Sequence, residues 1–350
     1  MILSNPTVSI IIPHWNGIEV LSECLASIKK SKFSSYEIIV SDNMSTDGSQ
    51  DWIKKNYPDI QLVENDKNYG FSGGCNRGAE AADGDYLLFL NNDTIHDENW
   101  IGPLVDKIKS DSTIGAVQPK ILNYYNRSIF DYAGGSGGHM DIFCYPFARG
   151  RVFLNQEEDM GQYNNSEKCF WASGTALLIK RELFFGCGKF DELFFAHMEE
   201  IDLCWRIQIM GYSVWSEPSS VVYHKNAVSL PMYSHKKYYL NHRNSLLMLL
   251  SNYSIPLAFY IGIIRWMLEI VALVYSMLKL DFNHATGIIR ALCWIILHPH
   301  EIIKRRIKLK NIRKIKDYEF IKSMEKSSTI VRYYLFGQNT YSDIKSKASS

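Results

Sequence analysis

Three features that the sequence lacks exclude several classes of protein. The seven cysteines are scattered at positions 24, 75, 144, 169, 187, 204 and 293 without Cys-x-x-Cys spacing, so we expect reduced thiols in a cytosolic protein and neither a disulfide framework nor a zinc site. Lys and Arg number 38 against 37 for Asp and Glu, so the chain lacks the cationic excess that is typical of nucleic-acid binding. No basic segment followed by an apolar run opens residues 1–7, so no secretory signal peptide is expected.

What the sequence does contain is an alternation of strand-like and helix-like segments. Short β-branched or apolar runs occupy residues 8–12, 36–40, 60–63 and 86–90, and apolar residues recur at helical spacing over 18–30. Strand, helix and strand at this spacing form βαβ units, which cross over right-handed. With 46% hydrophobic residues among 350, the chain can bury a large core. The sequence therefore predicts an α/β fold, with a mixed, mainly parallel sheet and flanking helices.

Polar residues follow directly after two of these predicted strands. Asn91, Asn92 and Asp93 follow one apolar run, and Asp42 lies at the end of another. Ligands of open α/β sheets bind at the carboxyl ends of the strands. A carboxylate flanked by amides can hold a divalent cation against a phosphate there, and Asp42 could accept hydrogen bonds from a ribose or a base. For the triplet that ends in Asp93, the alternative is a turn that caps the next helix.

Two glycine-rich segments lie between predicted elements. Residues 68–78 contain four glycines and lead into a helix-like stretch, so the free N–H groups at the helix start favour a diphosphate. Arg77 could add a cation for the phosphates or be a solvated surface arginine. The run Gly134–Gly138 predicts a flexible loop that could cover the site.

An acidic cluster opens the helix predicted to begin at residue 199. Glu199, Glu200 and Asp202 lie in its first turn, where the helix dipole stabilises negative charge. Capping of the helix would account for only one or two of these three carboxylates. Because the cluster follows the apolar residues 193–195, one of its carboxylates could be tuned as a general base.

Two further side chains each have two interpretations. Trp171 precedes the small residues 172–175, which leave room for a ligand, so its ring could stack on a sugar; the alternative is packing in the core. His224 ends a strand-like run at 221–224, where it could be structural or a ligand.

In this order, the segments resemble the family 2 inverting glycosyltransferases with a GT-A (Rossmann-like) fold, and in particular the rhamnosyltransferase-like branch of bacterial surface polysaccharide synthesis. The resemblance covers roughly residues 7–250. The motifs that carry it are SIIIPHWN at 9–16, VSDNMSTDG at 40–48, NYGFSGGCNRG at 68–78, LNND at 90–93, WASG at 171–174, EEIDL at 199–203 and His224.

The resemblance implies a role for each matching position. Asp93 and His224 would bind Mg²⁺ or Mn²⁺, and Glu200 would be the catalytic base. Most relatives have Asp at the position of Glu200, so Glu199 stays open as the alternative base. Because two of the three residues at 91–93 are Asn, the metal would be held largely by the donor diphosphate. The implied donor-binding residues are Pro13, His14, Asn16, Asp42, Asn43, Asn68, Gly70, Phe71, Asn76, Arg77, Asn91, Asn92 and Asp93. The implied acceptor or sugar contacts are Trp171, Ser173, Gly174 and Asp202.

The last hundred residues predict a membrane-associating helical region. Arg265, Glu269, Ala272, Ser276 and Lys279 form one narrow stripe on an otherwise apolar helix. Two charges in mid-segment argue against a simple transmembrane span. A second apolar stretch precedes eight cations at 304–316, a combination that suits an anionic cytoplasmic leaflet at about 1 kcal/mol per cation. The alternative is an oligomer interface.

These observations predict the domain organisation and the function. We expect a glycosyltransferase domain at 1–250, membrane or interface helices at 251–339 and a disordered tail at 340–350. The chain would be a cytoplasmic, peripherally membrane-associated enzyme that moves rhamnose from dTDP-rhamnose, a nucleoside-diphosphate sugar, to a lipid-linked saccharide. The alternatives are a UDP-hexose donor, or a non-catalytic subunit that binds a nucleotide-sugar or a glycan. A sugar nucleotidyltransferase is disfavoured, because residues 13–16 are not a basic glycine-rich loop. No nucleic-acid partner is expected, and a homo-oligomer stays open.

Overall fold

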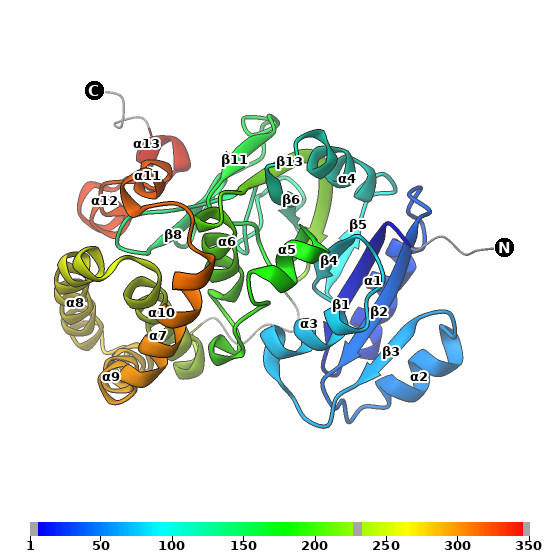
Figure 1. Ribbon diagram of the computed structural model, residues 1–350, viewed down its shortest axis with the longest axis horizontal. Helices are drawn as coiled ribbons and strands as arrows, with labels where there is room; N and C mark the ends of the chain where they lie inside the picture. Colours follow the sequence, from blue (N-terminus) through cyan, green and yellow to red (C-terminus); the bar gives the residue numbers. More distant parts are fainter. Residues whose placement is uncertain (1–5, 227–232, 346–350) are drawn as a thin grey trace.

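The computed structural model describes residues 6–226 and 233–345 and has the predicted α/β architecture, with further helices gathered beside the sheet (Figure 1). The first half contains β1 (Val8–His14), α1 (Ile18–Ile28), β2 (Tyr36–Asp42), α2 (Ser49–Asn56), β3 (Gln61–Glu64), α3 (Gly70–Glu80), β4 (Tyr86–Leu90), β5 (Thr94–His96), α4 (Ile101–Ser110) and β6 (Ile114–Asn123). The middle contains β7 (Gly138–Met140), β8 (Pro146–Ala148), β9 (Arg151–Val152), β10 (Asn155–Gln156), β11 (Glu167–Cys169), β12 (Ala176–Lys180), α5 (Arg181–Gly186), the 3-10 helix η1 (Glu192–Phe194), α6 (Glu199–Ile209) and β13 (Ser213–His224). The last part contains α7 (His235–Asn252), α8 (Ile255–Leu278), α9 (Phe282–Leu297), α10 (Pro299–Ile312), α11 (Asp317–Phe320), α12 (Thr329–Phe336) and α13 (Tyr341–Lys345).

In the described part of the chain the main sheet has nine strands, in the order β11-β13-β6-β12-β4-β1-β2-β3, with β5 paired to β13. β1 pairs in parallel with β2 and β4, and β13 pairs in parallel with β6. β12 lies antiparallel between β4 and β6. As a result β1, β2, β4, β6 and β13 run in one direction, and their carboxyl ends meet at one edge of the sheet.

The central strands are buried on both faces, which explains their continuous apolar runs. In β1, Ile10 and Ile12 pack into the core on one face, whereas Ile11 packs into the core on the other. The sheet therefore forms a rigid middle layer, and the polar residues that follow its strands are fixed relative to one another.

The segment between β6 and β12 differs from its prediction. Gly134–Gly138 is buried, not a flexible surface loop, because backbone and large side chains press against it. A Cβ atom on Gly135 would lie 2.2 Å from the Arg149 carbonyl oxygen, and one on Gly138 would lie 2.0 Å from the Trp171 ring. These glycines permit close packing. β7–β10 follow as a small antiparallel sheet.

The end of the chain is more ordered than predicted. Tyr341–Lys345, expected to lie in a disordered tail, forms α13, whose Ile344 is fully buried beside Phe147 and Val152. This contact with a sheet distant in sequence fixes the segment. Residues 346–350 lie outside the described residues. The predicted domain boundary at residue 250 falls within α7.

Helices α7–α10 form a layer beside α6 (left side of Figure 1). α8 is long and apolar enough to cross a membrane by length and composition, and only 28% of its most apolar window is buried. Three of the five residues of its polar stripe, Arg265, Glu269 and Ser276, are at most 2% exposed, whereas Ala272 is partly exposed and Lys279 is exposed. Arg265 and Glu269 form an ion pair, and His242 of α7 lies 2.6 Å from Glu269. The helix therefore has its polar residues inside and its apolar residues outside.

Candidate active site

The loops after β1, β2 and β4 are joined by buried hydrogen bonds. His14 Nδ1 lies 2.9 Å from the Asn92 amide nitrogen, and His14 Nε2 lies 2.9 Å from the Ser49 hydroxyl. Burial lowers the pKa of His14 although Asp42 and Asp47 lie nearby. Asn16 accepts a hydrogen bond from the Thr46 amide. The predicted donor-binding residues His14, Asn16 and Asn92 thus fix one loop against another.

Asp42 has the geometry expected of a ligand-binding carboxylate at a strand end. One oxygen accepts hydrogen bonds from the Ser45 amide at 2.9 Å and from the Gln50 side chain at 2.6 Å. The other oxygen is buried without a hydrogen-bond partner. A buried acceptor without a hydrogen bond costs stability. A ligand that donates a hydrogen bond to this oxygen would therefore bind favourably. Its neighbour Asn43 instead donates to the Gly70 carbonyl and accepts from Asn65.

Asp93 and His224, which are distant in sequence, meet at this sheet edge. His224 Nε2 lies 3.1 Å from an Asp93 oxygen, and His224 Nδ1 lies 2.9 Å from an Asp131 oxygen. Burial alone would lower the pKa of His224, but the charges of Asp93 and Asp131 outweigh it and raise the pKa to about 10. The Asn91 side chain also lies 3.3 Å from His224 Nε2. Asp131 holds the ring in the manner of the carboxylates that orient metal-binding histidines.

The acidic first turn of α6 reaches the same edge. A Cβ atom on Gly174 would lie 3.8 Å from the Glu200 Cβ atom, and the next residue, Thr175, accepts a hydrogen bond from the Asn91 amide. Glu200 is therefore close to the loop after β4. Glu200 and the Asp93–His224 pair thus lie on the same side of the sheet as the loop after β4.

The two glutamates of this turn differ in their environments. Burial, together with the neighbouring Glu200, raises the pKa of Glu199 well above its ordinary range. Burial also raises the pKa of Glu200, to about 7, which is near the optimum for a base at neutral pH. One oxygen of each carboxyl is buried without a hydrogen-bond partner. Glu199 is only 5% exposed, whereas Glu200 is partly exposed, so Glu200 is the better placed to meet a substrate.

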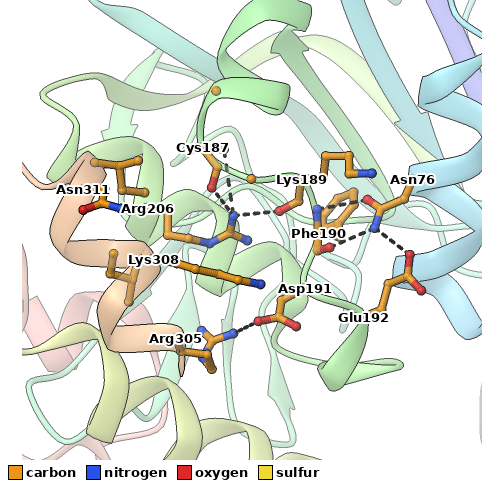
Figure 2. A pocket seen from close by; sticks show the side chains of 14 residues that line it. Asn76, Cys187, Lys189, Phe190, Asp191, Glu192, Arg206, Arg305, Lys308 and Asn311 are labelled. Atoms are coloured by element: carbon orange, nitrogen blue, oxygen red, sulfur yellow. Dashed lines mark hydrogen bonds and ion pairs between the residues drawn. The ribbon is translucent and has the colours of Figure 1, made fainter. Parts of the chain in front are cut away.

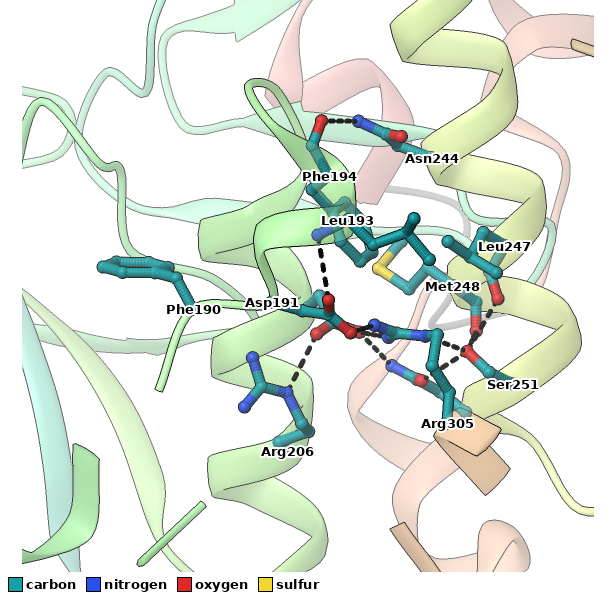
Figure 3. Close-up of polar contacts among 12 residues, drawn as sticks. Phe190, Asp191, Leu193, Phe194, Arg206, Asn244, Leu247, Met248, Ser251 and Arg305 are labelled. Carbon is teal, nitrogen blue, oxygen red and sulfur yellow. Dashed lines mark hydrogen bonds and ion pairs between the residues drawn. The ribbon is translucent and has the colours of Figure 1, made fainter. Parts of the chain in front are cut away.

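A strained loop presents these glutamates. Phe195, His197 and Met198 all have φ between 63° and 72°, a left-handed conformation that costs energy in residues other than glycine. Asn244 of α7 stabilises the loop, since its amide nitrogen lies within 3.1 Å of the carbonyl oxygens of Phe194, Ala196 and His197. Figure 3 shows Asn244 directed at Phe194. The position of the acidic turn thus depends on a helix from the C-terminal layer.

The glycines of α3 serve packing more than phosphate binding. A Cβ atom on Gly78 would lie 2.5 Å from Ile11, and one on Gly74 would lie 2.9 Å from Asn43. They let α3 lie directly on the sheet. At the helix start the Gly70 amide donates to the Asn68 side chain, and the Phe71 ring would lie 3.1 Å from a Cβ atom on Gly174. Phe71 therefore lies near the wall that also carries Glu200.

Asn76 and Arg77, predicted to bind the donor, are occupied by protein contacts. Asn76 accepts from the Phe190 amide and donates to the Phe190 carbonyl (Figure 2). Arg77 pairs with Glu192 at 3.1 Å, and its guanidinium lies 3.3 Å from the centre of the Tyr69 ring. Both side chains anchor the 190–192 segment to α3. That segment, with α10, lines an open cavity of about 520 Å³.

The residues predicted to contact the acceptor are all buried. Trp171 is 2% exposed, and its indole nitrogen donates to the His139 carbonyl, so it has the core position that the sequence left open as the alternative to sugar stacking. Ser173 donates to the Ala133 carbonyl. Gly174 lines the wall beside Phe71 and Glu200.

Asp202 lies at the centre of an ion network and does not face the site. It bonds Arg206 at 2.8 Å, Arg305 of α10 at 2.5 Å and the Asn252 side chain at 2.9 Å. Burial would raise its pKa, but the charges of Arg305 and Arg206 hold the pKa below its ordinary value. Arg305 also pairs with Asp191 (Figure 3). The network ties α10 to the helix that carries the acidic turn.

Sequence reasoning missed three residues that shape the site, namely Asp131, Asn244 and Arg305. Asp131 stands in a segment without periodicity, and Asn244 in a helix without a motif. Arg305 was counted as one of a run of cations. No local spacing distinguishes any of them, because each acts through a contact between segments distant in the sequence.

The sheet edge thus combines a buried carboxylate oxygen on Asp42, the Asp93–His224 pair and the two glutamates of α6. The model for "Glycosyl transferase family 2" matches residues 9–184. The chain belongs to this family and is a glycosyltransferase, as the sequence motifs predicted.

Named relatives are consistent with this membership. The chain is 27% identical over 221 residues to the N-acetylglucosaminyl-diphospho-decaprenol L-rhamnosyltransferase of Mycobacterium tuberculosis, covering 59% of this chain and 72% of that protein. It is 26% identical over 230 residues to the O-antigen biosynthesis protein RfbC of Myxococcus xanthus, covering 63% of this chain and 18% of that protein.

Solved structures share the fold. GalNAc-T7 with UDP, GalNAc and Mn²⁺ superposes with a TM-score of 0.57 at 22% identity, over 71% of this chain and 48% of that one. The mannosyltransferase PcManGT of Pyrobaculum calidifontis, with GDP-Man and Mn²⁺, has a TM-score of 0.52 at 17% identity, over 89% and 86%. The mixed, mainly parallel sheet with flanking helices is thus the GT-A fold.

Proposed function

We propose that this glycosyltransferase moves rhamnose, with inversion, from dTDP-rhamnose to a lipid-linked saccharide in the synthesis of a bacterial surface polysaccharide. The observation that carries the proposal is the partly exposed Glu200, whose raised pKa near 7 suits a base, beside the edge that holds Asp93 and His224. The relative named as an L-rhamnosyltransferase that uses a diphospho-decaprenol substrate supports this donor and this class of acceptor.

The reaction follows from the placement of these residues. An acceptor hydroxyl attacks the anomeric carbon opposite the nucleoside-diphosphate leaving group, through a transition state of oxocarbenium character. Glu200 removes the hydroxyl proton, which contributes about 10² to 10⁴-fold to the rate. Asp42 would accept a hydrogen bond from the nucleoside through its unpartnered oxygen.

A divalent metal ion held by Asp93 and His224 would take the place of the His224 Nε2 proton that faces Asp93. Asp131 orients the His224 ring while Nε2 points toward Asp93, and carboxylate and imidazole are both common metal ligands. Among the residues described, no group of three or more His, Cys, Asp or Glu forms a complete metal site, so the donor diphosphate would supply further ligands. A bound Mg²⁺ or Mn²⁺ would neutralise charge on the leaving diphosphate.

We further propose that the enzyme docks on the inner face of the cytoplasmic membrane through α8–α10. The outward side chains of α8 include Phe259, Ile263, Met267 and Ile270, each at least 50% exposed. A helix with its ion pairs inside and its apolar residues outside suits lipid better than water. The lysines of α10 at 304, 308 and 310 are exposed, and those that reach the membrane surface would meet anionic lipid.

Vesicle sedimentation tests the docking surface. A triple variant with Gln in place of Phe259, Ile263 and Met267 should bind less well to vesicles that contain anionic lipid, because it loses apolar area only from the surface proposed to contact the membrane. Met160, 83% exposed on another part of the protein, provides the control substitution Met160→Gln. Equal sedimentation of all forms would contradict the proposal, and a change in oligomeric state without a change in sedimentation would indicate an interface between copies of the chain.

A donor panel tests the proposed reaction. Release of nucleotide from dTDP-, UDP- and GDP-sugars is measured with N-acetylglucosaminyl-diphospho-polyprenol as acceptor. We expect turnover with dTDP-rhamnose. Turnover with a UDP-hexose alone would show that the donor is a UDP-hexose and not dTDP-rhamnose. Binding of a donor without release of nucleotide would favour a non-catalytic subunit.

A further inference from the structure

Two buried cations lie close to the same tyrosine ring. The Arg151 guanidinium of β9 lies 4.6 Å from the centre of the Tyr132 ring, and the Lys237 ammonium of α7 lies 5.4 Å from it. Arg151 is 8% exposed and Lys237 is 7% exposed. Neither residue has been assigned a role above.

Most other buried cations of the described residues pair with a carboxylate, and Arg243, which does not, instead donates to the Leu193 and Phe194 carbonyls and to the Asn244 side chain. Across the described ranges 6–226 and 233–345, Arg265 and Arg305 form ion pairs with acidic side chains, whereas Arg151 and Lys237 form none. Arg151 Nη1 donates to the Phe153 carbonyl, but Nε is buried without a hydrogen-bond partner. A buried cation without a counter-charge is costly, so this pair provides an incomplete site for an anion.

The pair lies beside the proposed base. Arg151 is close enough to Glu200 for its charge to oppose the rise in the pKa of that carboxyl that burial causes. Tyr132 directly follows Asp131, which bonds His224. Arg151 is therefore within electrostatic range of the base, and the ring that both cations approach follows the residue that bonds His224.

We propose that Arg151 and Lys237 bind a phosphate or diphosphate group of the acceptor. Arginine and lysine recognise phosphate oxygens through charge-assisted hydrogen bonds. Two substrates could bring a diphosphate, the donor and a lipid-linked acceptor. The acceptor is favoured because Lys237 belongs to α7, which packs against α8 and α9, whereas the donor would lie at the ends of β1, β2 and β4. This inference rests on the proposed function for the identity of the acceptor.

The experiment measures binding to the full chain, without turnover. Dodecyl diphosphate serves as the acceptor-type probe and dTDP as the donor-type probe, both titrated calorimetrically in EDTA. Arg151→Gln and Lys237→Gln are compared with Lys236→Gln, which removes the same charge from the exposed neighbouring residue. Arg151→Lys, which retains the charge, and the unfolding midpoint of each variant show whether a loss is due to misfolding.

We expect Arg151→Gln and Lys237→Gln each to weaken dodecyl diphosphate binding roughly ten- to hundred-fold, with partial recovery in Arg151→Lys. Lys236→Gln should bind like the wild type, and the affinity for dTDP should be the same in all forms. Unchanged dodecyl diphosphate affinity in folded Gln variants would overturn the proposal. A loss confined to dTDP would overturn the assignment to the acceptor.

These readouts separate the inference from the proposed function. A chain that binds dodecyl diphosphate through these cations but transfers no sugar would refute the function and support the anion site. A chain that transfers sugar and binds the probe equally well after both substitutions would refute the anion site alone.

Discussion

Glu200→Gln should abolish sugar transfer while it leaves donor binding nearly intact. The amide cannot accept the acceptor proton at neutral pH, so kcat should fall by about 10² to 10⁴-fold. The nucleoside would be held by the loops after β1 and β2, which do not include Glu200, so the donor Kd should change little. Glu199→Gln is the matched control. Because Glu199 is only 5% exposed, an acceptor hydroxyl would meet Glu200 and not Glu199, so Glu199→Gln should retain most of the wild-type rate.

The same substitution should stabilise the fold at alkaline pH. Burial raises the pKa of Glu200 from 4.5 to about 7, so the folded state binds this proton more tightly than the unfolded state. The stabilising effect of the proton is fully present below pH 4.5 and is lost as the pH rises through 7. The difference of about 2.5 in pKa corresponds to roughly 3 kcal/mol. This is an upper bound, because Glu200 retains some contact with solvent. At pH 8, Glu200→Gln should therefore raise the free energy of unfolding, whereas at pH 4 it should leave that energy nearly unchanged.

Two assays measure these effects. Nucleotide release between pH 5 and 9 should show kcat/KM of the wild type falling as the pH drops below about 7, and urea unfolding at pH 4 and pH 8 gives the stability difference. Full turnover by Glu200→Gln together with an inactive Glu199→Gln would show that the other carboxylate is the base. Equal stability of wild type and Glu200→Gln at both pH values would show that Glu200 is not buried as described.

Three further predictions follow from the contacts around the site. Asn244→Ala removes the amide that lies against three carbonyl oxygens of the strained loop, so kcat should fall by about ten-fold or more with little change in the donor Kd. An unchanged kcat would show that the loop keeps its conformation without Asn244. Arg305→Met leaves Asp202 without one of its cations and should lower the free energy of unfolding by about 3–5 kcal/mol in urea titrations, whereas Lys308→Met on the exposed face of the same helix should have little effect. EDTA should abolish sugar transfer, and Mn²⁺ or Mg²⁺ should restore it. In His224→Ala, added metal should restore less activity. Activity that persists at saturating EDTA would rule out the proposed metal dependence.

The prediction of the fold succeeded where local pattern and tertiary environment agree. Strands such as Tyr86–Leu90 are continuous apolar runs because they are buried on both faces, and that burial is visible in the sequence. Parallel strand direction then places Asp42, Asp93 and His224 at one edge without further information. The prediction of a flexible loop at 134–138 was wrong because glycine also permits close packing of the backbone. The glycines of α3 allow a helix to lie on the sheet, and those at 134–138 allow the backbone to pack against Trp171 and Arg149.

By itself, the sequence determined the family, the alternation of strands and helices along the first part of the chain and the chemical types at the strand ends, because these depend on short-range pattern. Only the tertiary structure decided which side chains are left for a ligand. Asp202 and Asn76 look like site residues in the sequence, yet buried partners from distant segments occupy them. Conversely, Arg151 and Lys237 have no motif, yet folding brings them together without a counter-charge. The reason is physical: charge pairing and burial depend on contacts between segments far apart in the chain, and sequence spacing does not specify them.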